Sequence, residues 1–184
     1  MHPDRLFFVL GASETALALF KRARSGARSA DRGSLATLWM VIVGAIVLAI
    51  VLSRAVPRAD LVVPGYVGTC AAGIFFAGLF LRGWAIVHLG RFFTVNVAIA
   101  SDHRVVNDGP YRLVRHPSYT GSLLEFLGLA VLLGNWLAGA CLFLPVLVVL
   151  LWRIGIEEKA LLGSLGEPYL DYMQRTKRLI PFLF

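Results

Sequence analysis

The chain has 184 residues, of which 58% are hydrophobic, and its mean hydropathy is +0.73. Soluble domains are about 45–50% apolar even when glycine is counted, so this composition excludes an ordinary soluble globular protein. The net charge is +7, from 18 Lys and Arg against 11 Asp and Glu. Because the basic residues lie beside apolar segments, they indicate contact with anionic membrane lipids and not with nucleic acid.

Five apolar segments are expected to form transmembrane helices, each of which needs about 20 residues to cross the hydrocarbon core. The first, residues 6–20, is short and contains Glu14, so it either spans the membrane or lies at its surface. The others are residues 35–53, 61–81, 119–133 and 136–152. Only Gly134 and Asn135 separate the last two, which predicts a tight helical hairpin over 119–152.

Small residues in the segment 61–81 predict close helix packing. Glycine allows neighbouring membrane helices to approach each other. The glycines of this segment are Gly65, Gly68, Gly73 and Gly78. The two cysteines, Cys70 and Cys141, lie in separate apolar runs without zinc-ligand spacing, so they are expected to be small buried residues, with no disulfide and no metal.

The polar regions carry nearly all of the Lys and Arg residues. Connector 21–33, segment 82–118 and the tail 153–184 are basic, whereas the turns between them hold only Arg54 and Arg58. Because basic loops stay in the cytoplasm, we expect the three regions inside and the amino end outside.

The stretch "GPYRLVRHPSYTG", residues 109–121, predicts a stiff ligand-binding loop. Pro110 and Pro117 fix two φ angles and restrict the residues before them. The loop presents Arg115, His116, Ser118 and Tyr119. This set suits an anionic or polar ligand; the alternative is a basic loop that only anchors the helices against lipid headgroups.

A second polar cluster directly follows the last apolar segment. Glu157 and Glu158 stand there, with Arg153 one helical turn before Glu157. Acidic groups at a membrane boundary are costly and indicate function. Residues at i and i+4 share a helix face, so Arg153 is the expected partner of Glu157, and Lys159 is a second candidate for Glu158.

Together the two clusters resemble the isoprenylcysteine carboxyl methyltransferase family and its phospholipid methyltransferase relatives. The resemblance is carried by "HRVVNDGPYRLVRHPSYTG" at 103–121, "RIGIEE" at 153–158, "LGEPYLDY" at 165–172 and the closing "LIPFLF". Membrane sterol reductases, which bind NADPH, share a segment similar to "RHPSYTG". The double Glu followed by Gly166, Tyr169 and Tyr172 favours the methyltransferases.

The resemblance implies an all-α integral membrane protein. It also implies a pocket for S-adenosyl-L-methionine on the cytosolic side, formed by the loop 109–121, called the polar loop below, and the carboxyl-terminal helices. Residues 1–81 would then hold about three transmembrane helices and the connector, and residues 82–184 the catalytic region. The membrane is expected to be the inner membrane of a bacterium or the endoplasmic reticulum of a eukaryote.

The site residues are implied position by position. Cofactor contacts are expected from His103, Arg104, Val105, Val106, Tyr111, His116, Pro117, Ser118, Tyr119 and Glu157. Arg115 joins them because Arg115 or His116 could meet the cofactor carboxylate. Arg153 falls where the family has a substrate-contacting arginine, and Asn96 falls where a relative has glutamine. Arg153 and Glu157 are the expected catalytic residues.

The implied reaction is methylation of the carboxylate of an isoprenylcysteine-like or other lipophilic substrate that enters from the bilayer. A carboxylate is already ionised at neutral pH and needs no general base. The amine of phosphatidylethanolamine would need one, and no residue is distinguished by its spacing for that role. The alternatives are therefore a phospholipid N-methyltransferase, an NADPH-dependent membrane reductase and a non-catalytic scaffold in contact with membrane lipids.

Overall fold

A computed structural model describes residues 6–12, 28–29, 33–92, 98–99, 104–181 and 183 of the protein. Its helices are α2 (Ser34–Ala55), α3 (Gly65–Leu89), α4 (Pro117–Leu132), α5 (Trp136–Leu165) and α6 (Glu167–Arg175). Residues 6–12 are also helical. Shorter elements are the 3-10 helices η1 (Pro57–Ala59), η2 (Gly90–Phe92) and η3 (Gly109–Arg112), and the antiparallel pair β1 (Arg28–Ser29) and β2 (Ala98–Ile99). The predicted all-helical fold is confirmed apart from this two-residue ladder.

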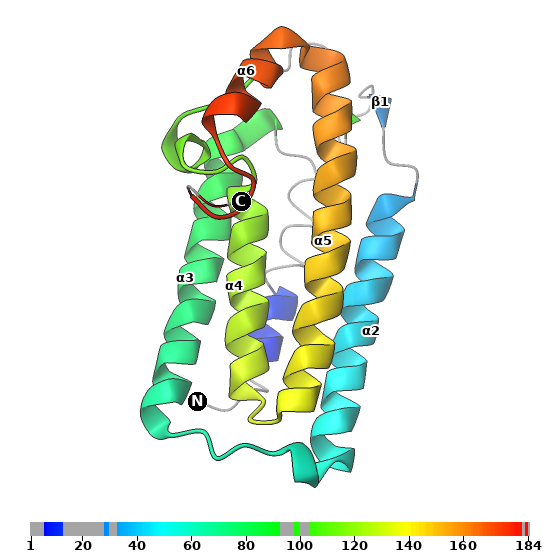
Figure 1. Cartoon of the computed structure of the whole chain (residues 1–184), viewed down its shortest axis with the longest axis vertical. Coiled ribbons are helices and arrows are strands. Elements are labelled where there is room, and N and C mark those ends of the chain that lie inside the picture. Colours follow the sequence, from blue (N-terminus) through cyan, green and yellow to red (C-terminus); the bar gives the residue numbers. More distant parts are fainter. Residues whose placement is uncertain are drawn as a thin grey trace.

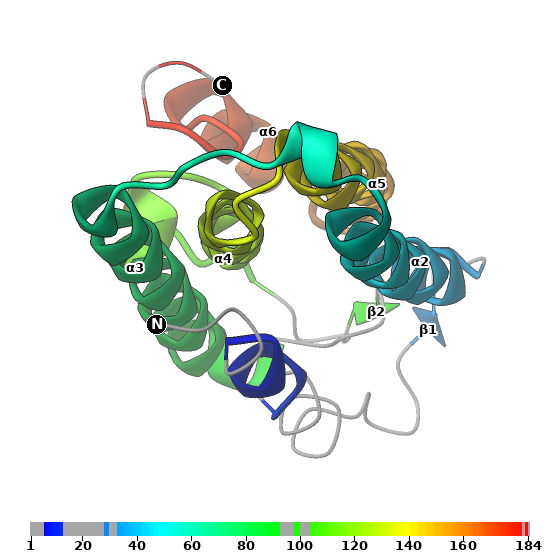
Figure 2. The same ribbon diagram turned by 90° about the horizontal axis from the view of Figure 1, so that it is seen from below.

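The four long helices form a row in which α3 packs on α4, α4 on α5 and α5 on α2 (Figure 1). Successive helices run in opposite directions, so α2 begins and α3 and α5 end near α6. Figure 2 shows that the row is curved and that the helical residues 6–12 lie on its inner side. Leu6 and Leu10 of this segment are buried in the same core as Phe75, Leu129 and Leu142.

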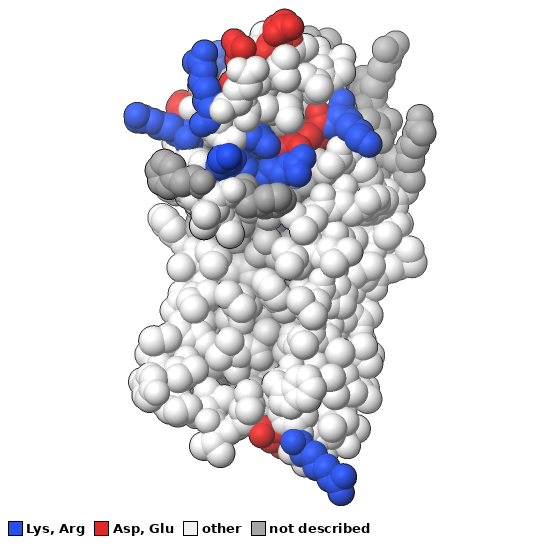
Figure 3. All heavy atoms as spheres, viewed as in Figure 1, with Lys and Arg blue, Asp and Glu red and all other residues white. Residues whose placement is uncertain are grey.

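Three described helices are long and apolar enough to cross a membrane. They are α2, α3 together with η2 (Gly65–Phe92), and α5. On the face seen in Figure 3, charged side chains gather at the two ends of the molecule, with an uncharged belt between them. The fold is therefore that of an integral membrane protein. Helix α4 has 16 residues, fewer than the about 20 of a typical span, and residues 13–20 of the first expected segment lie outside the described residues.

Helix α3 is longer than the sequence suggested. It was expected to end at residue 81, but it continues to Leu89, so Arg82 is part of the helix. The helix stops at Gly90, whose positive φ of +56° is a backbone conformation that glycine adopts readily and other residues rarely do. Arg82 is accommodated because its guanidinium lies 3.6 Å from the buried carboxylate of Glu125 on α4.

Close contact between α3 and α4 depends on glycine at both helices. A Cβ atom at Gly78 would lie 2.5 Å from the carbonyl oxygen of Gly121, and one at Gly121 would lie 2.6 Å from that of Gly78. The packing role expected of Gly78 is thus confirmed, whereas a Cβ at Gly65 or Gly73 would meet nothing within 4 Å. This contact holds the first turns of α4, which carry the end of the polar loop, against α3.

The two free cysteines differ in exposure. Cys141 on α5 is partly buried, but Cys70 on α3 is exposed. The expectation that both are buried is therefore wrong for Cys70. A thiol is a small and weakly polar group, so it suits an outward-facing position within an apolar belt.

Candidate active site

The polar loop is fastened to the end of α3 through η3. Tyr111 donates a hydrogen bond from its hydroxyl to the carbonyl oxygen of Ala85 at 3.2 Å, and Tyr172 of α6 donates to the carbonyl oxygen of Tyr111 at 2.6 Å. Burial raises the pKa of both phenols, so both stay protonated donors at neutral pH. Gly109 has φ +53°, and a Cβ there would lie 2.6 Å from the His88 ring, so only glycine fits.

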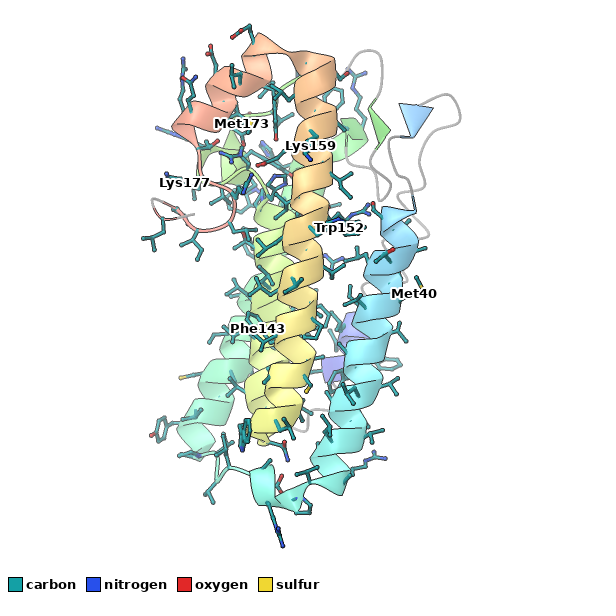
Figure 4. All side chains as sticks on the ribbon, turned by 45° about the vertical axis from the view of Figure 1, so that its right-hand side comes forward. Met40, Phe143, Trp152, Lys159, Met173 and Lys177 are labelled. Carbon is teal, nitrogen blue, oxygen red and sulfur yellow. The ribbon has the colours of Figure 1, made fainter. Side chains whose placement is uncertain are left out.

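The loop also pairs with the carboxyl-terminal segment that follows α6. The main-chain N–H groups of Arg115 and His116 donate to the carbonyl oxygens of Lys177 and Arg178, at 2.8 and 3.0 Å. These backbone bonds fix the direction in which both side chains leave the loop. Figure 4 shows Met173 on α6 and Lys177 on the segment after it, both beside the upper part of α5.

Glu158 joins α5 to both segments. Its Oε1 accepts from Nε of Arg115 at 2.9 Å and lies 3.3 Å from Nε2 of His116, and its Oε2 accepts from Nε and Nη2 of Arg178 at 3.0 and 2.8 Å. The Glu158 side chain is only 5% exposed. Its partners are thus distant in sequence, whereas the neighbouring Lys159 is exposed on the outer surface of α5 (Figure 4).

Arg115 is engaged within the protein. Besides Glu158, its Nη1 donates to the carbonyl oxygens of Met173, at 3.0 Å, and Thr176. These bonds tie the loop to the end of α6. The contact with a cofactor carboxylate that the sequence suggested for Arg115 stays a prediction.

Tyr119 connects Arg153 to Glu157. Its hydroxyl donates to Oε2 of Glu157 at 2.9 Å and accepts from Nε of Arg153 at 3.3 Å. Nη1 of Arg153 donates to the hydroxyl of Ser34, the first residue of α2, at 2.8 Å. Arg153 is 2% exposed, so α2, α4 and α5 together enclose its guanidinium. The phenol therefore takes the place of the direct contact expected between Arg153 and Glu157.

His116 lies between the two acidic residues. Its Nδ1 is 4.0 Å from Oε2 of Glu157, and its Nε2 faces Glu158. The rings of His116 and Tyr119 are 5.6 Å apart between centroids, at an angle of 30°. His116 is buried, whereas the Glu157 side chain is 30% exposed and so remains accessible. The loop and the acidic pair, distant along the chain, meet at one end of the bundle.

The remaining expected site residues lie around this cluster. Pro117 is the buried first residue of α4, and Ser118 beside it is partly buried. Arg104 is exposed, and Val105 and Val106 are partly buried in the irregular stretch before η3. Asn96 and His103 lie outside the described residues. Within the described part of the chain, no three His, Cys, Asp or Glu residues gather in a way that could hold a metal ion.

Sequence reasoning missed two participants in this network. Ser34 contacts a residue 119 positions away, and Arg178 follows the last helix. Ser34 follows Gly33 at the start of a helix, which is a common position for serine. No local pattern therefore distinguishes it as a site residue. Arg178 is one of several basic residues in the tail, and only the fold shows which of them reaches Glu158.

Comparison with known proteins was made on sequence and on structure. The chain is 36% identical over 117 residues to the protein-S-isoprenylcysteine O-methyltransferase of Schizosaccharomyces pombe, which covers 62% of this chain and 50% of the relative. It is 35% identical over 108 residues to protein-S-isoprenylcysteine O-methyltransferase B of Arabidopsis thaliana, covering 58% and 55%. A solved structure of a eukaryotic intramembrane Ras methyltransferase, ICMT, aligns with a TM-score of 0.61 and 29% identity, over 79% of this chain and 52% of that chain.

The chain therefore spans about half the length of the curated relatives it matches. Residues 71–163 match the family model described as Isoprenylcysteine carboxyl methyltransferase (ICMT). This region contains the polar loop, Arg153 and both acidic residues, and it excludes Ser34 and the carboxyl-terminal segment. Because the match covers half of the chain, the protein belongs to the isoprenylcysteine carboxyl methyltransferase family.

Proposed function

We propose that the protein is an integral-membrane methyltransferase that uses S-adenosyl-L-methionine and methylates the carboxylate of an isoprenylcysteine-like or other lipophilic substrate. The names of the relatives support the reaction class. The observation that carries the proposal is the Tyr119 hydroxyl bound to both Arg153 and Glu157. It brings the accessible carboxylate of Glu157 and the buried guanidinium of Arg153 to the membrane boundary, where a lipid-like substrate can reach them.

The proposal includes a topology. Helix α4 and the segment 6–20 complete five crossings with α2, α3 and α5, and residues 82–184 form the catalytic region. The end that carries α6 faces the cytoplasm, in a bacterial inner membrane or in the endoplasmic reticulum. The distribution of charge supports this orientation: among the described residues, the basic side chains of the opposite end are Arg54 and Arg58, and most of the others lie at the α6 end (Figure 3).

The residues at this end fit the functional groups of S-adenosyl-L-methionine. Glu157 is an accessible carboxylate suited to an ammonium group, and it has acceptor capacity beyond the bond from Tyr119. The rings of His116 and Tyr119 offer flat surfaces for an adenine or a sulfonium. When bound, the cofactor supplies an electrophilic methyl group.

Arg153 is suited to orient the substrate carboxylate. Ser34 and Tyr119 fix its guanidinium before substrate binds, which lowers the cost of ordering it. Burial at this position also strengthens its attraction for a negative charge, because water screens little there. The carboxylate is ionised at neutral pH, so the chain needs to supply orientation and dryness but no base.

A methyl-transfer assay on the detergent-purified protein tests the proposal. An isoprenylcysteine with a free carboxylate is offered together with radioactive S-adenosyl-L-methionine, and its methyl ester serves as the blocked control. Label in the free acid and none in the ester supports the proposal. Label in phosphatidylethanolamine with none in the acid would replace it with phospholipid methylation. No transfer, with stabilisation by NADPH, would replace it with a reductase.

A further inference from the structure

Glu158 uses its two carboxylate oxygens for different partners. Oε1 faces Nε of Arg115 at 2.9 Å and Nε2 of His116 at 3.3 Å, whereas Oε2 takes both bonds from Arg178. Two guanidinium groups beside one buried carboxylate keep it ionised. An ionised carboxylate only accepts hydrogen bonds, so the ring nitrogen of His116 that faces it must carry a hydrogen.

This requirement selects one form of the His116 ring. A neutral imidazole has one N–H, so a hydrogen on Nε2 leaves Nδ1 as an acceptor. Of the two neutral tautomers, Glu158 therefore selects the one with its hydrogen on Nε2.

The chosen tautomer matters for the accessible side of the ring. Nδ1 of His116 then points toward Oε2 of Glu157 across 4.0 Å, which is too long for a direct hydrogen bond. Two acceptors at this separation match one donor group placed between them. The backbone bond from His116 N–H to the carbonyl of Arg178 at 3.0 Å fixes the residue in this orientation.

We propose that Glu158 is a positioning residue: it holds His116 in the Nε2–H tautomer, so that Nδ1 of His116 and the carboxylate of Glu157 together accept from an N–H donor of the ligand. The donor assigned here, the ammonium group of the cofactor, rests on the function proposed above. Glu158 itself does not touch the ligand. Glu158 thus acts through His116, whereas Glu157 contacts the ligand directly.

The tautomer can be measured without any ligand. The full chain is prepared with ¹⁵N in the histidine rings, in detergent at neutral pH, and His116 is identified among the four histidines by the signals lost in His116→Gln. We expect one protonated Nε2 and one unprotonated Nδ1 in the wild type. In Glu158→Gln the ring should show a mixture of tautomers. A wild-type ring with its hydrogen on Nδ1, or with both nitrogens protonated, would overturn the inference, and so would an unchanged spectrum in Glu158→Gln.

Two further variants separate this role from a general effect on folding. Arg178→Gln removes the guanidinium bound to Oε2 and leaves the partners of Oε1 in place, so the Nε2–H tautomer of His116 should persist. Loss of the tautomer in this variant would contradict the separate roles of the two Glu158 oxygens. Glu167→Gln, which changes an exposed acid at the start of α6, is the matched control and should leave the ring unchanged. If Glu158→Gln does not fold, the wild-type and Arg178→Gln spectra still decide the question.

Ligand binding links the tautomer to the site. S-adenosylhomocysteine, which retains the ammonium group, should bind Glu158→Gln about tenfold more weakly than the wild type, as expected for one lost charge-assisted contact. Equal affinity in the two proteins would overturn the assigned donor. A wild type that shows the expected tautomer but binds no S-adenosylhomocysteine would instead refute the proposed function and leave the positioning of His116 standing.

Discussion

The hydroxyl of Tyr119 lies between Arg153 and Glu157, accepting from Nε of the arginine at 3.3 Å and donating to Oε2 of the acid at 2.9 Å. The two charged residues belong to one helix, and the phenol comes from another. A hydroxyl can accept and donate at once, so it satisfies both neighbours. The part of the site proposed to hold substrate and the part proposed to hold cofactor are therefore coupled through one oxygen atom.

Tyr119→Phe should lower kcat/KM for methyl transfer about tenfold to a hundredfold. The change removes two hydrogen bonds to charged groups, and the loss of one such bond from the transition state, about 1.5–3 kcal/mol, corresponds to this range. Steady-state kinetics with varied cofactor and varied acceptor measure the effect. Tyr66→Phe, at an exposed position near the opposite end of α3, is the control. A Tyr119→Phe enzyme with wild-type kinetics would show that the bridge is dispensable.

Ser34→Ala should affect the acceptor more than the cofactor. The Ser34 hydroxyl accepts from Nη1 of Arg153, so its loss removes one of the bonds that hold the guanidinium proposed to orient the carboxylate. We expect KM for the acceptor to rise about fivefold, the scale of one hydrogen bond, with cofactor affinity unchanged within about twofold.

Ser53→Ala is the matched control on the same helix, because in the described part of the chain the Ser53 hydroxyl donates to the carbonyl oxygen of Ile50, one turn earlier. It should leave both constants unchanged. A larger loss of cofactor affinity than of acceptor affinity in Ser34→Ala would contradict the assignment of Arg153 to the substrate.

Gly121→Ala should destabilise the fold. Its methyl group would lie 2.6 Å from the carbonyl oxygen of Gly78, and helix backbones cannot yield cheaply at such a contact. Overpacking of this kind costs about 1–3 kcal/mol, which thermal unfolding in detergent detects as a lower Tm. Gly73→Ala has open space around it and should leave Tm unchanged or higher. Equal effects of both changes would mean that the α3–α4 contact is not tightly packed.

The buried phenols of Tyr111 and Tyr172 should make stability fall at alkaline pH. Burial raises the pKa of both above the ordinary value of 10.0, so the folded protein binds more protons than the unfolded chain once the pH exceeds about 10. Their contribution is present below that pH and is lost as the pH rises further.

Thermal unfolding of Tyr172→Phe tests whether stability falls with rising pH in this way. At neutral pH the variant should melt below the wild type, because it lacks the bond to the carbonyl of Tyr111. Between about pH 10 and 11 the difference should narrow, since the variant has one titrating phenol fewer. A difference that stays constant or widens over this range would contradict the shifted pKa of Tyr172.

Much of the helical framework could be predicted because long apolar segments of the sequence identify membrane helices. The turn between α4 and α5 is equally local: Asn135 caps α5 through the N–H of Ala138 at 2.9 Å. The position at which α3 ends could not be predicted from the local sequence. Arg82 suggested a loop, but Glu125 on the next helix offsets the cost of keeping the charge in the helix.

Several residues of the candidate site could be named from the sequence, but the contacts between them could not. Spacing along one helix placed Arg153 and Glu157 on one face, and the structure inserts Tyr119 from α4 between them. The partners of Glu158 depend on how the loop and the carboxyl-terminal segment pack together. No local pattern in the sequence encodes such contacts, because each is set by the tertiary fold.

Calorimetric titration of the purified protein with S-adenosylhomocysteine tests most directly whether Glu157 and its neighbours form a cofactor site. We predict saturable binding to the wild type and to Glu167→Gln, and binding to Glu157→Gln that is weaker by about tenfold or more. Arg153→Ala should bind nearly as the wild type does, because that residue is assigned to the substrate. The absence of binding to the wild type, or equal binding to Glu157→Gln, would contradict the account.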